Sequence, residues 1–238
     1  MVWSVCRRHQ SIQASKELHV VPKLQDQLDQ ISEQTRSLVQ PERLQPSENA
    51  VKELFATGIE QQILSAENLA PEFSLPDACG RIVHSADLLA LGPLVVKFFR
   101  GRWCPYCMTE LAAWKQIYPE LRKRGALLVA ISPQTVHQND LLLQQHPFPF
   151  PVLSDPGLTV ADQFRIAYFV PAYHQKHYRS ILVNIPFIND DPSWRLLLPA
   201  TYLLRPDGSI AYAQAHADFR VRPEPEEVLA ALDRELSR

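Results

Sequence analysis

The chain has 238 residues, of which 46% are hydrophobic and 21% charged, so it can bury one sizeable core. A net charge of −2 argues against nucleic-acid binding, and no apolar run approaches the ~20 residues that span a bilayer. The first 40 residues are polar and lack the apolar stretch and cleavage site of a secretory signal, so we expect a cytoplasmic protein without membrane contact.

Residues 1–67 are expected to form an N-terminal helical extension. Leucine and isoleucine recur at helical spacing over 24–38. Ser47 and Gly58 are suitable residues to begin and end a second helix. These helices either pack on the main domain or form a dimerisation arm, because the apolar spacing over 24–38 is close to a heptad. The second interpretation would make the protein a homodimer.

Residues 68–238 alternate between strand and helix patterns. In chain order the sequence predicts a strand over 93–99, a helix over 108–124, a strand over 126–131, a helix over 135–146, a strand over 151–153, a helix over 158–164, an irregular stretch over 166–199, a hairpin of strands over 201–204 and 210–213, and a closing helix over 226–236. This order predicts an α/β fold whose mixed central sheet carries helices on both faces.

Two cysteines, Cys104 and Cys107, follow the first of these strands after a short loop and open the next helix. Unpaired N–H groups and the helix dipole favour a thiolate at that position. Pro105 suits the first helical turn because its missing N–H would have no partner there. A spacing of three places both sulfurs on one helix face, so we expect a reversible disulfide between them.

Other uses of the cysteines are open. The chain has four cysteines, too few for a disulfide scaffold. A zinc site would need about four ligands, and Cys6 and His9 have plausible spacing to supply the other two. The pair could also be buried and inert, and Cys79 is expected to be an incidental thiol. We expect no metal and no cofactor.

The residues around the pair are candidates for supporting roles. Trp103 and Tyr106 are expected to shape a shallow apolar groove. Arg100 and Arg102 could lower the pKa of a thiol or steer anions, or could be solvated loop charges. Glu110 is expected to support the start of the helix and not to act as a base.

At these residues the sequence resembles the thioredoxin superfamily and, more closely, peroxiredoxin-like proteins of the alkyl hydroperoxide reductase/thiol-specific antioxidant family. The resemblance covers about residues 68–236. It rests on the segments 70–76 (APEFSLP), 98–107 (FFRGRWCPYC), 153–156 (LSDP) and 198–204 (LPATYLL). It implies a thioredoxin-like fold and an antioxidant oxidoreductase. Such an enzyme reduces hydroperoxides or protein disulfides through its dithiol and is itself recharged by a thioredoxin- or glutathione-type reductant.

The resemblance implies two different roles for the cysteines. Peroxiredoxins carry a Pro-x-x-x-Thr-x-x-Cys loop, on which Cys107 takes the peroxide-attacking position while Cys104 replaces the threonine and Arg100 the proline. The later arginine of that family would fall near Pro199 and is absent there. In thioredoxin-like proteins Cys104 would attack, Cys107 would resolve, and Pro199 would match a proline held in the cis form beside the cysteines.

We expect Cys104 to attack first, because a residue at the helix opening should be more exposed and have the lower pKa. A non-enzymatic alternative is a thioredoxin-fold interaction module that uses the aromatic stretch 168–194 as its contact surface. Modules of that class usually lack the cysteine pair, which this chain keeps.

Overall fold

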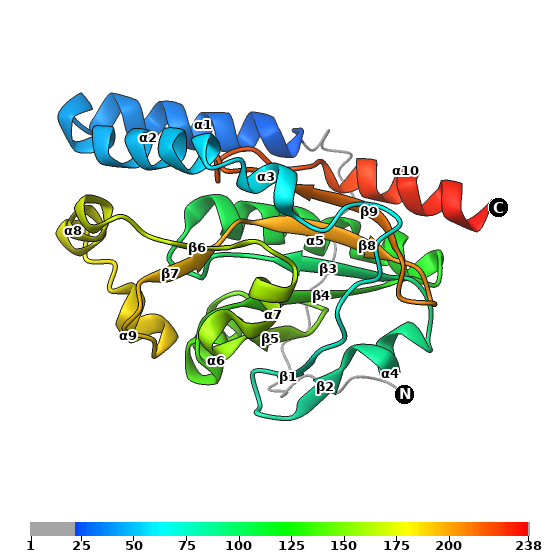
Figure 1. The fold of residues 1–238 in the computed structure, drawn as a ribbon. Coiled ribbons are helices and arrows are strands. Elements are labelled where there is room, and N and C mark those ends of the chain that lie inside the picture. The colour runs from blue at the N-terminus through cyan, green and yellow to red at the C-terminus, as the bar shows by residue number, and fades with distance from the viewer. Residues whose placement is uncertain (1–21, 238) are drawn as a thin grey trace.

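The structure is a computed structural model that describes residues 22–237, and a five-stranded mixed sheet lies at its centre (Figure 1). The strand order is β5-β4-β3-β8-β9. Strands β3, β4 and β5 run parallel, whereas β8 is antiparallel to β3 and β9 is antiparallel to β8. The strands are β3 (Leu94–Phe98), β4 (Leu127–Ser132), β5 (Val152–Ser154), β8 (Ala200–Leu204) and β9 (Ile210–Ala215). All five correspond to strands that the sequence predicts.

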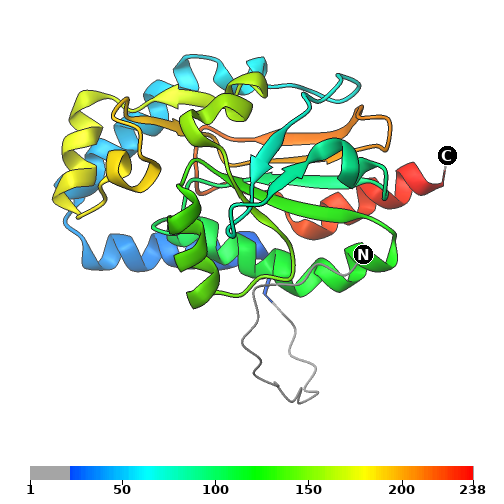
Figure 2. The same ribbon diagram turned by 90° about the horizontal axis from the view of Figure 1, so that it is seen from below.

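Helices cover both faces of this sheet (Figure 2). One face meets α4 (Ser85–Leu89), the short helix α7 (Thr159–Gln163) and the hairpin of β1 (Ser74–Pro76) and β2 (Ile82–His84). The other face meets α5 (Pro105–Lys123), α10 (Pro225–Leu236) and α1 (Leu24–Leu38). Side chains alternate across a strand, so β3 sends Val96 to the first face and Val95 to the second. The same alternation puts Lys97 on the second face, toward α5. Helix α6 (Val136–Gln145) follows β4, and the 3₁₀ turn η1 (Pro156–Leu158) precedes α7.

The N-terminal helices pack on this domain. Helix α1 (Leu24–Leu38) lies against α5, and its Leu24 and Leu28 are buried in the core of the α5 face. Helix α2 (Pro41–Ala56) begins before the expected Ser47, because Pro41 occupies the first turn, where its missing N–H costs nothing. A short α3 (Ile59–Gln62) leads to the main domain.

The stretch 166–199 is not irregular as expected. It contains β6 (Ala167–Phe169), α8 (Ala172–Ser180), α9 (Ile185–Asn189) and β7 (Arg195–Leu197), with β6 and β7 paired. Pro171 and Pro186 stand at the start of α8 and α9, so these prolines initiate short helices. Tyr178 and Trp194 are buried in a small core of this subdomain, while Phe169 is exposed. The subdomain lies at the end of the molecule away from the C-terminus, with α8 against α2 (Figures 1 and 2).

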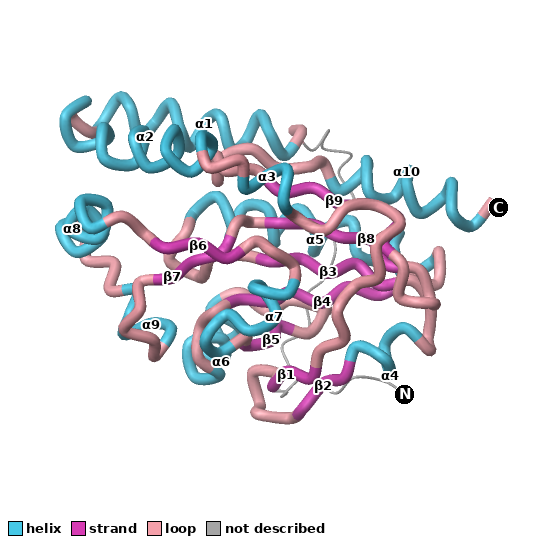
Figure 3. The backbone as a smooth tube through the Cα atoms, in the orientation of Figure 1, coloured by secondary structure: helices cyan, strands magenta, loops and turns pink. Residues whose placement is uncertain are grey.

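A loop over residues 216–224 joins β9 to α10 (Figure 3). It carries no helix or strand but makes several contacts with the N-terminal helices, described below. Within residues 22–237, no helix is long and apolar enough to cross a membrane.

Candidate active site

Both cysteines of the pair lie where β3 passes into α5. Cys104 precedes the first helical residue, Pro105, and its carbonyl accepts the N–H of Met108 at 3.1 Å. The loop before it needs glycine at 101, where φ is +145° and a Cβ would stand 2.6 Å from the indole Nε1 of Trp103. Cys104 and Cys107 are reduced thiols with 1% and 0% of their surface exposed.

The sulfur of Cys107 is surrounded by donors and positive charge. Burial opposes its ionisation, but the Cys104 thiol, the guanidinium groups of Arg222 and Arg100, and the backbone N–H of Arg100 outweigh burial. The pKa of Cys107 therefore lies well below its ordinary value. Among these groups, Arg222 donates from its Nη2 to Cys107 Sγ at 3.4 Å.

Cys104 has the opposite tendency. Burial raises the pKa of its thiol, and so do its hydrogen bond to Cys107 and the negative charge there. Arg100 and Arg222 offset only part of this rise. The expectation that Cys104 has the lower pKa is therefore wrong, and the exposure expected of its sulfur is absent because both thiols are buried. Other side chains cover Cys104 at the helix opening, and the guanidinium of Arg222 donates to the sulfur of Cys107.

A row of buried charges continues from Cys107 to the sheet. Arg222 Nη1 lies 2.7 Å from Glu110 Oε2, and Lys97 Nζ lies 2.6 Å from Glu110 Oε1. All three side chains are fully buried. Lys97 and Arg222 both contact this one carboxylate, and Arg222 also donates to the Cys107 sulfur. Burial lowers the pKa of Lys97, and the charge of Glu110 opposes that shift. Isolated buried charges are costly, and this pairing favours the ionised sulfur.

Arg100 is a further buried cation, enclosed by aromatic rings. Its guanidinium carbon lies 4.3 Å from the ring centre of Phe219, 4.8 Å from that of Trp103 and 5.9 Å from that of Tyr178. The guanidinium also donates to the hydroxyl of Tyr178. Its Nε has no hydrogen-bond partner among the described residues. Arg100 is therefore not a solvated loop charge, and it has a donor left for another acceptor.

A sequence model of the AhpC/TSA family matches residues 66–213, which is more than half of the chain. The chain belongs to the AhpC/TSA family. A peroxiredoxin homologue of Mycobacterium tuberculosis (strain CDC 1551 / Oshkosh) is 32% identical over 95 residues, covering 40% of this chain and 62% of the relative. Peroxiredoxin Q, chloroplastic, of Sedum lineare is 30% identical over 96 residues, covering 40% and 51%. The chain thus spans less than two thirds of the length of these curated relatives.

The crystal structure of peroxidoxin BcpB from Mycobacterium tuberculosis matches with a TM-score of 0.57 at 20% identity, over 72% of this chain and 97% of that chain. This similarity confirms the thioredoxin-like fold expected from the sequence. The family match ends before Arg222 and begins after α1 and α2. In this AhpC/TSA protein, one cation beside the cysteine pair therefore comes from outside the matched segment.

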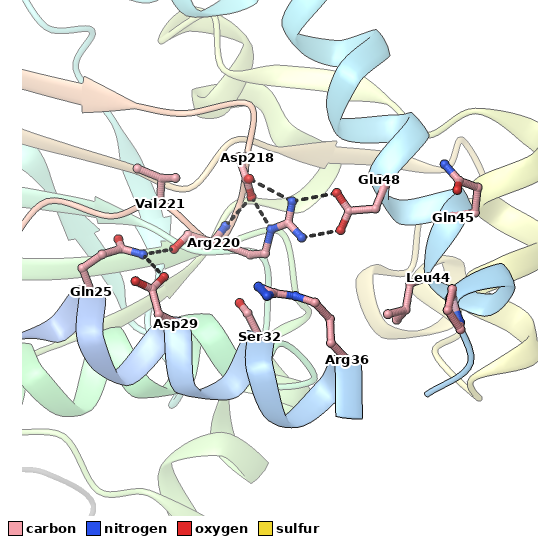
Figure 4. Close-up of a pocket in the computed structure, with 11 residues that line it drawn as sticks. Gln25, Asp29, Ser32, Arg36, Leu44, Gln45, Glu48, Asp218, Arg220 and Val221 are labelled. Atoms are coloured by element: carbon pink, nitrogen blue, oxygen red, sulfur yellow. Dashed lines mark hydrogen bonds and ion pairs between the residues drawn. The ribbon is translucent and has the colours of Figure 1, made fainter. Parts of the chain in front are cut away.

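The loop that carries Arg222 is attached to the N-terminal helices (Figure 4). Arg220 Nη2 donates to Glu48 Oε2 of α2 at 3.1 Å, and the Gln25 amide donates to the Arg220 carbonyl at 3.3 Å. Glu224 accepts the N–H groups of Leu24 and Gln25 at 2.8 and 2.9 Å and so caps α1. Both helices line a cleft of ≈ 680 Å³ beside this loop. The N-terminal helices thereby hold the segment that places Arg222 against Cys107.

The predicted supporting residues have different roles. Trp103 covers Arg100, and Tyr106 packs on Phe219 with ring centres 5.3 Å apart. The Tyr106 hydroxyl contacts the Ser32 hydroxyl of α1 at 3.1 Å. Arg102 is directed away from the pair, because its Nε donates to Gln138 of α6 at 3.0 Å.

The expected cis bond at Pro199 is absent, since no peptide bond among the described residues is cis. Pro199 is buried and precedes Ala200, whose carbonyl accepts Lys97 Nζ at 3.2 Å. Pro199 is therefore next in the chain to a residue that contacts Lys97.

The zinc alternative receives no support: within residues 22–237, no group of three or more His, Cys, Asp or Glu side chains could hold a metal ion. Cys6 and His9 lie outside the described residues.

Sequence reasoning missed Lys97 and Arg222 and did not predict the buried ion pairs of Glu110. Lys97 is a charge within the otherwise apolar run 93–99, which is a usable signal because a buried strand rarely carries an unpaired lysine. Glu110 was expected only to support the helix start, although it lies one turn after Cys107. Arg222 carries no local signal, because 115 residues separate it from the sulfur it contacts.

Proposed function

We propose that this chain is a peroxiredoxin-type thiol peroxidase in which Cys107 attacks a hydroperoxide and Cys104 resolves the product. The observation that carries the proposal is the environment of Cys107, whose sulfur accepts from the Arg222 guanidinium at 3.4 Å and whose pKa is lowered by its hydrogen bond to Cys104 and by nearby cations. The thiolate is the attacking form of cysteine. Family membership and the peroxiredoxin relatives support the same reaction.

In the first step the Cys107 thiolate attacks the outer oxygen of the hydroperoxide. A sulfur–oxygen bond forms, the oxygen–oxygen bond breaks, and Cys107 becomes a sulfenic acid. The sulfur loses two electrons and the peroxide gains them. The departing alkoxide or hydroxide takes a proton and leaves as alcohol or water. Arg100, with its unused Nε donor, is the cation available to the developing negative charge on the leaving oxygen.

In the second step Cys104 attacks the sulfenic sulfur, and a disulfide forms with release of water. The shifts in the two pKa values give this step its order. The negative charge on Cys107 is one cause of the raised pKa of Cys104, and oxidation of Cys107 removes that charge. Burial still opposes ionisation of Cys104, but Arg100 and Arg222 then act without the opposing charge of Cys107, so the Cys104 thiol ionises more readily.

A thioredoxin- or glutathione-type reductant would restore the two thiols by thiol–disulfide exchange. Burial of both sulfurs favours a small hydroperoxide over a protein disulfide as the oxidising substrate, because a protein partner would have to reach sulfurs that are covered. We take residues 1–67 to be an N-terminal extension and 68–238 to be the redoxin domain, with α1 and α2 of the extension supporting the loop that carries Arg222.

Single-turnover experiments on wild type, Cys104→Ser and Cys107→Ser test the proposal. Hydroperoxide should convert Cys104→Ser to a sulfenic acid at Cys107, detected with a dimedone probe and mass spectrometry. Wild type should give the Cys104–Cys107 disulfide, and Cys107→Ser should react no faster than a free thiol. A Cys107→Ser protein that keeps the wild-type rate, or that accumulates mixed disulfides at Cys104 with protein disulfide substrates, would refute the assignment.

A further inference from the structure

Three buried hydrogen-bond donors beside the cysteine pair have no acceptor among the described residues. Two of them are Arg100 Nε and Trp103 Nε1. The third is the hydroxyl of Tyr178 on α8, whose oxygen accepts from the Arg100 guanidinium while no acceptor within residues 22–237 takes its proton. Buried donors are almost always paired in folded proteins, so three unpaired donors in one place indicate a site for an oxygen-bearing ligand.

The three side chains contact one another and adjoin both sulfurs. The guanidinium carbon of Arg100 lies 4.8 Å from the ring centre of Trp103, and the rings of Trp103 and Tyr178 meet edge to face with centres 5.4 Å apart. The Arg100 backbone N–H donates to the Cys107 sulfur, and the charge of Cys104 acts on the Tyr178 hydroxyl. An oxygen atom bound by these donors would therefore be held beside the pair.

The Tyr178 hydroxyl can act as an acid at this place. Burial raises the pKa of Tyr178 and Arg100 opposes part of the rise, so the hydroxyl keeps its proton near pH 7. A phenol has an ordinary pKa of about 10 and water one of about 15.7, so Tyr178 remains the stronger acid despite burial. Transfer of its proton to a departing hydroxide or alkoxide is favourable, and the Arg100 guanidinium stabilises the phenolate that forms.

We infer that the Tyr178 hydroxyl donates its proton to the leaving oxygen of the hydroperoxide and then takes the proton of Cys104. The inference rests on the proposed function and adds a catalytic residue to it. While the Cys107 thiolate bonds to the outer oxygen, the inner oxygen leaves with the Tyr178 proton as alcohol or water. The phenolate, paired with Arg100, next takes the proton of the Cys104 thiol. The Cys104 thiolate attacks the sulfenic sulfur, a disulfide forms, and the departing hydroxide takes a proton from solvent.

The test compares Tyr178→Phe, which removes the hydroxyl and keeps the ring, with Tyr173→Phe on the same helix. The Tyr173 hydroxyl interacts with Glu53 of α2 instead. Hydrogen peroxide releases hydroxide, which must be protonated, whereas peracetic acid releases acetate, which is stable as an anion near pH 7. Oxidation of Cys107 by hydrogen peroxide in a single turnover should be about 100-fold slower in Tyr178→Phe, as expected when an acid catalyst is lost. The rate with peracetic acid should stay near the wild-type value, and Tyr173→Phe should match wild type with both oxidants.

A hydroxyl that only positions Arg100 gives a different pattern, because that cation is near the leaving oxygen of either oxidant. Equal loss with both oxidants in Tyr178→Phe, or no loss with either, would refute the role of Tyr178 and retain the proposed function. Failure of both oxidants to form a sulfenic acid or disulfide at Cys107 in wild type would refute the proposed function itself. In wild type, deuterium oxide should slow the reaction with hydrogen peroxide more than that with peracetic acid, and equal slowing would contradict proton donation.

The second proton transfer has a separate readout. After peracetic acid, Tyr178→Phe should accumulate a sulfenic acid at Cys107 that dimedone labels, because Cys104 keeps its proton. Wild type and Tyr173→Phe should proceed to the Cys104–Cys107 disulfide. Disulfide formation at the wild-type rate in Tyr178→Phe would show that the Cys104 proton does not pass to Tyr178.

Discussion

Replacing Arg222 by methionine should raise the pKa of Cys107 and slow its reaction with hydroperoxide near neutral pH. Two full charges 3.4 Å apart attract by about 5 kcal/mol at an effective dielectric constant of ~20. Arg222 shares its charge with Glu110, so the net value should be closer to that of a hydrogen bond to a charged group, about 1.5–3 kcal/mol. At a pH below the pKa of Cys107 in both proteins, a loss of this size lowers the thiolate fraction, and with it the rate, about 10- to 150-fold.

The sign of the pH dependence follows from the direction of the shift. In wild type the thiolate persists well below the ordinary pKa of cysteine, because cations stabilise it. In Arg222→Met the thiolate forms only at higher pH. The rate deficit should therefore be largest at acidic to neutral pH and should shrink as the pH rises above about 8.5.

The assay is the rate of alkylation and of peroxide reaction against pH, with the ultraviolet absorbance of the thiolate recorded in parallel. Arg222→Lys retains a cation and should lose less than Arg222→Met. Arg102→Met is the matched control, because Arg102 contacts Gln138 in α6. Superimposable pH profiles for wild type and a folded Arg222→Met would refute the reasoning.

Two further predictions concern the surroundings of the pair. Glu110→Gln leaves Lys97 and Arg222 without their carboxylate and should destabilise the fold by about 3–5 kcal/mol, measured by denaturant unfolding. A loss below about 1 kcal/mol, the value of an exposed pair, would contradict the burial of this row. Phe219→Ala removes the ring that packs on Tyr106 and on the Arg100 guanidinium and should speed alkylation of both thiols. If Phe187→Ala, an exposed control, accelerates alkylation equally, Phe219 does not cover them.

The buried row of charges also explains how a thiolate can exist in a core without solvent. Burial alone would keep both cysteines protonated, since it raises the pKa of each. The hydrogen bond from Cys104 and the guanidinium groups of Arg222 and Arg100 lower the pKa of Cys107, whereas the pKa of Cys104 is raised. The proposed cycle needs this difference in pKa at its start, because Cys107 attacks as a thiolate before Cys104 reacts.

The arrangement of the cysteines could be predicted from local sequence. An apolar strand ending at Phe98, a glycine loop and Pro105 at the first turn specify a strand-to-helix junction by interactions within a few residues. The hairpin at Asp207-Gly208 is specified in the same way, by residues that suit a turn. These elements are found where the sequence places them, because backbone conformation there depends on near neighbours.

The chemistry of the pair was decided by tertiary structure. Helix position alone favoured Cys104 as the thiolate, but Arg222 arrives from a loop 115 residues away and contacts Cys107. Lys97 and Glu110 meet only because β3 alternates its side chains and α5 packs on one of its faces. Electrostatic energies in a core depend on distance and burial, which no short segment of sequence contains. The sequence by itself therefore determined where two thiols would stand, and only the fold decided which of them would carry the charge.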